Sequence, residues 1–168
     1  MNKIKTLATL IDLLDSSTNQ QYKNLDTKIE IPIDQFSSII NFSKDHYTRH
    51  CIKRTENYEL LLLCWDTDQG TPIHYHGGED CWLYVLDGSI EEGRYKEENG
   101  IPQQVSIAKY YAGDDAYIND EIGFHHIANT GGQKSITLHI YMNPIKSCNV
   151  YDEDKKVFYI KEYNNPHT

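Results

Sequence analysis

Short apolar or alternating runs separated by turn residues dominate the chain from Tyr58 onward. In chain order they are YELLLLCW, CWLYVLDG, SIEEGRY, QVSIAKYY, DAYIN, GFHHIAN, SITLHIYM, CNVYD and KVFYI. Many short strands at close spacing are typical of a β-sandwich or a β-barrel. The pattern therefore predicts a mainly β fold over about residues 57–162.

In the first part of the chain the apolar residues are spaced differently. Apolar residues at helical spacing predict an amphipathic helix over about residues 3–15, and residues 16–26 are polar and predict a loop. A second helix is predicted to begin at Pro32, because proline is tolerated in a first helical turn. The residues that carry these two patterns are Ile4, Leu7, Leu10, Ile11 and Leu14, and then Phe36, Ile39 and Ile40. We expect residues 1–50 to form a helical segment that packs against the strands.

Length and composition place the chain among globular proteins. Its 168 residues suit one domain, 1–168, and no repeat or linker marks a boundary. A formal charge of −9 argues against nucleic acid or an anionic membrane as a partner, since phosphates would be repelled. No segment reaches the roughly 18 apolar residues that a membrane span needs.

The N-terminus and the cysteines bear on localisation. MNKIKTLATLIDLLD has a basic start and an apolar stretch, but Asp12 and Asp15 interrupt it and no small-residue cleavage site follows, so we expect mature sequence. The four cysteines lie at irregular spacings without a CxxC pair, which predicts neither a zinc ribbon nor a disulfide framework. We expect a cytoplasmic protein.

The segment PIHYHGGEDCWLYVLDG contains the first candidate for metal chemistry. On a strand, His74 and His76 would share one face, because successive side chains point to opposite sides. Imidazole suits zinc, copper, iron and nickel, so the pair alone does not select the metal. Two such histidines are also often ordinary exposed or hydrogen-bonded residues, and a third ligand has to come from elsewhere.

The run GFHHIAN supplies a candidate third ligand. His125 and His126 must face opposite sides of a strand, so one of them is the ligand. We choose His125, both because it precedes Asn129 with the His-x-x-x-Asn spacing and because of the family resemblance given below, and we assign His126 to the outer surface. Three imidazoles leave positions open for substrate, as a catalytic ion requires. The alternative is a site of two histidines and one carboxylate, with Glu79 or Asp80 as the third ligand.

Four separated segments together resemble cysteine dioxygenase of the eukaryotic type, a member of the cupin superfamily. They are HYTR, PIHYHGGEDCWLYVLDGSIEEGRY, AYINDEIGFHHIAN and TLHIYMNPIKSC. The resemblance implies a small cupin-type β-barrel, or jelly roll, with two or three N-terminal helices packed against it. It also implies that ferrous iron, Fe(2+), is bound by His74, His76 and His125.

The resemblance further assigns residues to the substrate and to a covalent crosslink. Arg49 would bind the substrate carboxylate, which a planar guanidinium matches with two hydrogen bonds, and Tyr47 would form a polar wall. Cys81 and Tyr141 would form a thioether beside the iron, and His139 would orient the Tyr141 hydroxyl. If the family resemblance is set aside, the same residues have ordinary interpretations: Arg49 could be a surface cation, Tyr141 a core tyrosine and Cys81 a small buried hydrophobic residue.

The implied reaction adds both atoms of O2 to the sulfur of L-cysteine and gives cysteine sulfinate. This is a step of cysteine catabolism toward hypotaurine and taurine, and we expect a monomeric enzyme. One alternative is a dioxygenase for 3-mercaptopropionate or another small thiol. Cysteamine fits less well, because it has no carboxylate for Arg49. A second alternative, from another class, is a non-catalytic cupin that binds a small ligand.

Overall fold

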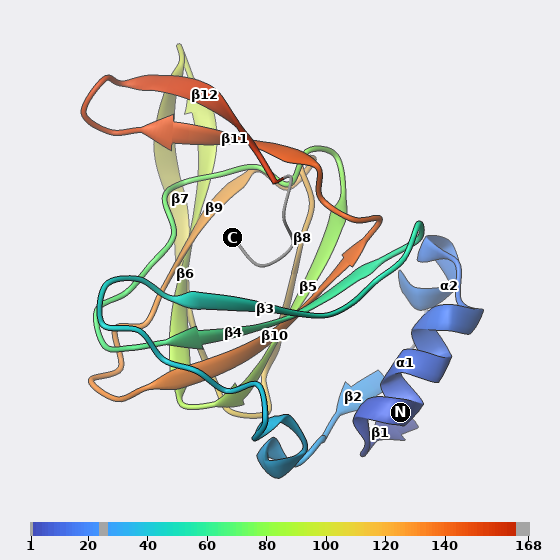
Figure 1. Ribbon diagram of the computed structural model, residues 1–168. Helices are drawn as coiled ribbons and strands as arrows, with labels where there is room; N and C mark the ends of the chain where they lie inside the picture. Colours follow the sequence, from blue (N-terminus) through green and yellow to red (C-terminus); the bar gives the residue numbers. More distant parts are fainter. Residues whose placement is uncertain (1, 24–26, 164–168) are drawn as a thin grey trace.

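A computed structural model describes residues 2–23 and 27–163 and confirms the mainly β prediction (Figure 1). The helical elements are α1 (Leu7–Ser16), α2 (Asn19–Lys23) and the 3-10 helix η1 (Ile33–Phe36). The strands are β1 (Asn2–Ile4), β2 (Thr27–Ile29), β3 (Thr48–Arg54), β4 (Glu59–Trp65), β5 (Asp80–Asp87), β6 (Ser89–Glu98), β7 (Ile101–Tyr111), β8 (Asp115–Ile118), β9 (Phe124–Ala128), β10 (Ser135–Met142), β11 (Ser147–Asp152) and β12 (Val157–Glu162).

Apart from the small sheet of β1 and β2, the strands form three hydrogen-bonded groups. One sheet has the order β3-β4-β10-β5-β8, and the other groups are β7-β6-β9 and the hairpin β11-β12. Backbone pairing at residues 70–75 connects the last two groups, since Gly70 pairs with Ala128 and His74 pairs with both His125 and Val150. Segments far apart in the sequence therefore meet along one layer, opposite the five-stranded sheet (Figure 1).

The hydrophobic core has two main clusters, which lie on opposite faces of strand β4. All of its residues are buried, because both faces of the strand are covered. Leu60 and Leu62 pack with the N-terminal segment, and Leu61 and Leu63 pack with the residues between the two layers. The helical segment thus covers one face of the sheet and leaves the other face to line the interior, as we expected of its packing.

The N-terminal helix is shorter than predicted. It begins at Leu7, because the Thr6 hydroxyl caps it by accepting a hydrogen bond from the backbone N–H of Thr9 at 3.1 Å. Residues 3 and 4, which were predicted to be helical, instead belong to β1, which pairs in parallel with β2. The apolar spacing correctly predicted which face of α1 is buried, since that face includes Leu10 and Leu14.

Two further predictions for this segment were wrong. Helix α2 lies within residues 16–26, which we predicted to be a loop, and it buries Tyr22 edge-on against Trp82 with ring centroids 4.9 Å apart. The helix predicted from Pro32 is only the short η1. Strand β3 also lies partly within residues 1–50, so strand structure starts before residue 57. The single domain remains a prediction.

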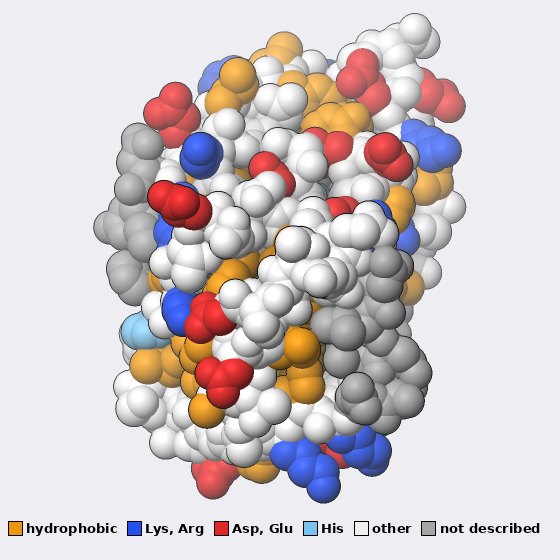
Figure 2. All heavy atoms as spheres, turned by 90° about the vertical axis from the view of Figure 1, so that its right-hand side faces the viewer, with side chains coloured by type: hydrophobic (Ala, Val, Ile, Leu, Met, Phe, Trp, Pro, Cys, Tyr) orange, Lys and Arg blue, Asp and Glu red, His pale blue; other side chains and the backbone are white. Residues whose placement is uncertain are grey.

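Charged side chains of both signs are dispersed over the face shown in Figure 2, with hydrophobic side chains between them. Lysine and arginine lie singly or in small groups among aspartate and glutamate on this face. None of the helices that the structure describes has the length and apolar character needed to cross a bilayer.

Candidate metal centre and adjoining cavity

Backbone pairing places His74 directly beside His125. The His74 N–H donates to the His125 carbonyl at 2.9 Å, and the His125 N–H donates to the His74 carbonyl at 3.1 Å. Residues that exchange both bonds project their side chains on the same side of the pair. The prediction of a strand at His74 and His76 was wrong, because both residues lie between β4 and β5 and, of the two, His74 alone forms isolated bridges.

A tight turn fixes the position of His76. The Asp120 carboxylate accepts hydrogen bonds from the backbone N–H groups of His76 at 2.7 Å and Gly78 at 2.6 Å. Gly77 has φ +66°, and a Cβ atom there would lie 2.4 Å from the Ser147 carbonyl oxygen, so only glycine fits without movement. Asp120 was not identified from the sequence, because its partners are about forty residues away along the chain.

Three histidine side chains converge as predicted. One nitrogen from each of His74, His76 and His125 lies within 4.8 Å of the others. Their ring centroids are 5.2 Å apart for His74 and His76, 4.7 Å for His74 and His125, and 4.5 Å for His76 and His125. Among the described residues, this is the one group of three or more metal-ligating side chains.

The hydrogen bonds of these rings fit a metal. The Nδ1 of His74 lies 2.9 Å from the Pro72 carbonyl oxygen, and the Nδ1 of His125 lies 2.8 Å from Glu92 Oε1. Carbonyl and carboxylate oxygens accept, so each Nδ1 donates and each Nε2 keeps a free lone pair. Both ring nitrogens of His76 are buried without a hydrogen-bond partner. A buried polar atom without a partner is costly, and a metal ion would satisfy one of these two nitrogens.

Burial also keeps the three imidazoles neutral. Desolvation lowers the pKa of His74 to about 4 and lowers the pKa values of His76 and His125 well below the ordinary value, with further lowering by the neighbouring histidines. Metal ligation requires the unprotonated ring, so these histidines do not have to lose a proton near neutral pH.

The alternative ligands point elsewhere. Glu79 accepts a hydrogen bond from the Asn143 side chain at 2.9 Å, and Asp80 accepts hydrogen bonds from Tyr117 and Asn119. His126, assigned to the outer surface, is half-buried, and its Nδ1 contacts the Thr71 carbonyl on the side of β9 opposite His125. These contacts favour the three-histidine set.

Glu92 is the main residue near the metal centre that sequence reasoning missed. Its Oε1 accepts from His125, and its Oε2 accepts from Arg94 Nε at 2.9 Å and from the Tyr110 hydroxyl at 3.2 Å. The side chain is 1% exposed, so these partners compensate its buried charge. The available signal was the alternation of SIEEGRY, which places Glu92 on the same face as buried Ile90.

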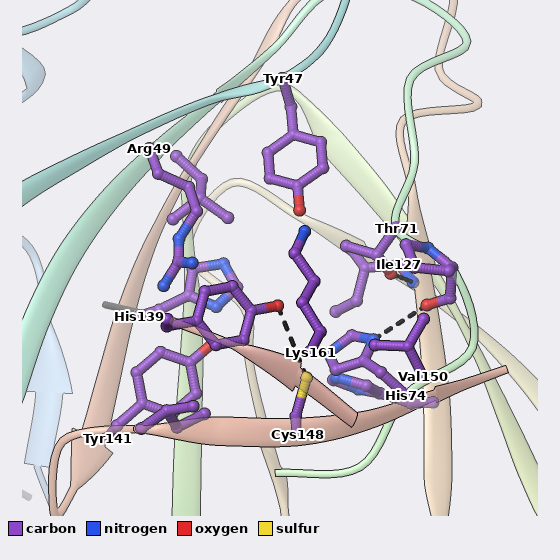
Figure 3. Close-up of a pocket in the computed structure, with 15 residues that line it drawn as sticks. Tyr47, Arg49, Thr71, His74, Ile127, His139, Tyr141, Cys148, Val150 and Lys161 are labelled. Atoms are coloured by element: carbon purple, nitrogen blue, oxygen red, sulfur yellow. Dashed lines mark hydrogen bonds between the residues drawn. The ribbon is translucent and has the colours of Figure 1, made fainter. Parts of the chain in front are cut away.

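A small cavity of about 40 Å³ adjoins the metal centre, where His74 and His125 form part of its lining (Figure 3). It brings together Arg49, Tyr47, His139 and Tyr141 from separate parts of the chain. Desolvation and the nearby Arg49 charge lower the pKa of His139 to about 3. The complete lining is Tyr47, Arg49, Leu63, Thr71, Pro72, His74, His125, Ile127, His139, Tyr141, Ile145, Cys148, Val150, Lys161 and Tyr163.

Hydrogen bonds connect His139 to the wall of the cavity. Trp65 Nε1 donates to the Thr137 hydroxyl oxygen at 2.9 Å, and that oxygen lies 2.9 Å from His139 Nε2. Tyr47 stacks on Trp65 with ring centroids 4.5 Å apart. The His139 ring lies 6.3 Å from the ring of Tyr141, so its role in orienting the Tyr141 hydroxyl remains a prediction.

Cys81 and Tyr141 are direct cross-strand partners. They face each other in the pairing of β5 and β10, where the Cβ atoms of opposite residues lie about 4.5–5.5 Å apart. Cys81 is 1% exposed and Tyr141 is 7% exposed. The Tyr141 ring centroid lies 6.2 Å from that of His76. The two residues proposed for a thioether are therefore buried together beside the metal centre, and Cys81 is a free cysteine.

Comparison with known proteins identifies the family. The family model described as cysteine dioxygenase type I matches residues 1–154. The chain belongs to this family. Cysteine dioxygenase type 1 of Danio rerio is 28% identical over 158 residues, which are 89% of this chain and 77% of the relative. The Homo sapiens protein of the same name is 27% identical over 163 residues, or 90% and 81% of the two chains. The chain is thus an oxidoreductase of the dioxygenase type.

Solved structures support the cupin fold. A Klebsiella pneumoniae protein with a double-stranded β-helix domain aligns with TM-score 0.57 and 17% identity, and the match covers 70% of this chain and 94% of that protein. A Desulfovibrio desulfuricans RmlC-like cupin aligns with TM-score 0.52 and 15% identity, covering 63% and 91%. The predicted cupin fold is confirmed. In this cysteine dioxygenase family member, His74, His76 and His125 are accordingly the ligands available to a metal cofactor.

Replacing Glu92 by glutamine should weaken metal binding. The neutral amide could not supply the negative charge that holds the His125 Nδ1 proton and raises the basicity of Nε2. We expect the dissociation constant for ferrous iron to rise about 10- to 100-fold, the range seen when such supporting partners of metal ligands are lost. An air-free competition titration against a chelator measures this constant.

Glu91→Gln is the matched control for this change. Glu91 lies next to Glu92 on β6 but on the opposite face of the strand, so its variant should bind iron as the parent does. Equal affinities for the Glu92→Gln and Glu91→Gln proteins would show that Glu92 does not support the metal centre.

Proposed function

We propose that this chain is a cysteine dioxygenase that contains Fe(2+) and converts L-cysteine and O2 to cysteine sulfinate. The main support is the placement of three neutral imidazoles, His74, His76 and His125, beside a cavity that also contains Arg49. Such a cavity provides a metal centre and a fixed positive charge within the space of one small amino acid. Family membership is consistent with this reaction.

Bound iron would supply open coordination positions for the substrate thiolate and for dioxygen, and the electron transfer between them. Three protein ligands suit that task, because they leave positions free. The thiol of cysteine has a pKa near 8.5, and a divalent metal lowers it, so no separate protein base is required.

Arg49 is proposed to bind the substrate carboxylate. Its guanidinium belongs to β3 and enters the cavity from the side of the five-stranded sheet, where β3 pairs with β4 (Figure 3). A guanidinium and a carboxylate form two parallel hydrogen bonds, which fix both the position and the rotation of the amino acid. The sulfur is then held toward the histidines, and proximity favours its oxidation.

Tyr141, His139 and Tyr47 are proposed to shape the cavity around the reacting atoms. Desolvation raises the pKa of Tyr141 well above its ordinary value, so the hydroxyl stays protonated and can donate a hydrogen bond to substrate or oxygen. His139 is neutral, and Thr137 and Trp65 hold its ring in place. Tyr47 contributes a polar wall near Arg49. The small cavity suits cysteine or 3-mercaptopropionate better than a peptide.

The product, cysteine sulfinate, would enter cysteine catabolism toward hypotaurine and taurine. We also propose that the enzyme is a cytoplasmic monomer without a nucleic-acid or membrane partner. The net charge of −9 supports the exclusion of polyanionic partners.

Oxygen uptake with simultaneous measurement of sulfinate tests the proposed reaction. The iron-loaded protein should consume one O2 for each cysteine oxidised, and more slowly with 3-mercaptopropionate, which lacks the amine. Arg49→Gln should lower kcat/KM for cysteine about 100-fold, since two charge-assisted hydrogen bonds are lost. Lys109→Gln, which removes a charge from the exposed part of β7, should leave the rate unchanged.

Two results would change this assignment. Faster turnover of 3-mercaptopropionate than of cysteine would identify that thiol as the substrate. Failure of the iron-loaded protein to oxidise any small thiol would favour a ligand-binding cupin instead.

The thioether should be visible by gel mobility. Forming a bond between Cys81 Sγ and a ring carbon of Tyr141 removes one hydrogen from each residue. Reduction of dioxygen to hydrogen peroxide at the loaded iron site would take up the two electrons and the two protons. Iron-loaded protein after turnover should therefore run as two bands, and Cys81→Ser should give one band at the position of the uncrosslinked form. Cys64→Ser, a buried cysteine on β4, is the control and should keep both bands. A doublet that persists in Cys81→Ser would exclude this crosslink.

A further inference from the structure

Two cations lie against the same aromatic ring at the cavity. The Arg49 Cζ atom is 4.7 Å from the centroid of Tyr163, and the Lys161 Nζ atom is 5.3 Å from the same centroid. Arg49 comes from β3 and Lys161 from β12, and both side chains line the same cavity (Figure 3). The Lys161 amine points toward the Tyr47 hydroxyl in that view.

Strand pairing explains how an exposed lysine reaches the cavity. Lys161 is opposite Cys148 in the pairing of β11 and β12, and residues opposite each other share a face. Cys148 is buried in the cavity wall, whereas Ile160, the neighbour of Lys161, is 69% exposed on the other face. The Tyr163 N–H donates to the Lys146 carbonyl at 2.8 Å, which ties the end of this hairpin.

The charge of the cavity differs from that of the whole chain. The chain carries a net charge of −9, but the described residues that line the cavity include two cations and no carboxylate. Like charges repel more strongly where water is partly excluded, and an anion close to both offsets that repulsion. The cavity is thus suited to an anionic group.

We propose that Lys161 is a second carboxylate-binding residue, which holds the substrate carboxylate together with Arg49 and selects thiols that carry this group. The inference rests on the proposed function, because it concerns the substrate of that reaction. Arg49 supplies the planar fork from β3, and Lys161 adds a point charge from β12. The two cations approach the carboxylate from different strands, with the Tyr163 ring beside both.

Substrate binding to variants of Lys161 tests this role. Cysteine and cysteamine are titrated into the iron-loaded protein in the absence of oxygen, and the heat of binding gives each dissociation constant. Lys161→Met keeps much of the length of the side chain but removes the charge. Its dissociation constant for cysteine should rise about fivefold, as expected for loss of a partly exposed charge pair. Binding of cysteamine, which has no carboxylate, should change less than about twofold.

Two control variants, a kinetic measurement and a salt titration distinguish carboxylate binding by Lys161 from a general effect of the substitution on the protein. Lys161→Arg should restore cysteine binding, and Lys109→Met, which removes the same charge from β7, should bind both thiols as the parent does. In air, Lys161→Met should raise KM for cysteine and leave kcat nearly unchanged. Added salt should weaken cysteine binding more in the parent than in Lys161→Met, since salt screens the attraction.

The possible results distinguish this inference from the proposed reaction. Parent-like cysteine binding by Lys161→Met, or equal weakening of cysteine and cysteamine, would overturn the role of Lys161. Selective loss of cysteine affinity supports that role even if the parent produces no sulfinate, in which case the proposed reaction fails alone. A parent protein that binds neither thiol would overturn both.

Discussion

Reciprocal backbone hydrogen bonds between His74 and His125 are the constraint on which the metal centre depends. They bring a segment before β5 against β9, so two of the three imidazoles are adjacent without help from a metal. The third follows two residues after His74, and Asp120 fixes its turn. Because Nδ1 of His74 and of His125 is already occupied, the orientation of those two ligands is set in advance.

The five-stranded sheet separates this polar site from a hydrophobic layer. On β10, Leu138 and Ile140 pack with the N-terminal segment, and His139 and Tyr141 face the cavity. Successive side chains of β10 point to opposite faces of the sheet, so one face is apolar and the other carries the polar residues. The apolar face has to be covered, and the helices cover it. Polar residues can then be held rigidly on the inner face, where burial keeps His139 neutral and Tyr141 protonated.

The sequence was most informative where a local pattern reports the structure directly. The alternating runs predicted β4 to β12 well. Strand alternation showed that His125 and His126 could not both be ligands, and the His-x-x-x-Asn spacing and the family resemblance favoured His125. The prediction failed where distant contacts decide the result. Residues 2–4 become a strand because β2 is available to pair with them, and the 3-10 turn at Ile33–Phe36 replaces a longer helix. Sheet pairing brings Glu92 to His125 and Tyr110 and brings Lys161 to the cavity, so no short motif identifies these contacts.

Ferrous iron content per chain, measured after air-free loading and removal of excess metal, tests the central claim most directly. The account predicts one iron per chain in the parent and in His46→Ala, a control at an exposed histidine. It predicts less than about a tenth of that amount in each of the single variants His74→Ala, His76→Ala and His125→Ala, because loss of any ligand leaves an incomplete site. Full iron content in any of these three variants would contradict a centre built from the three imidazoles.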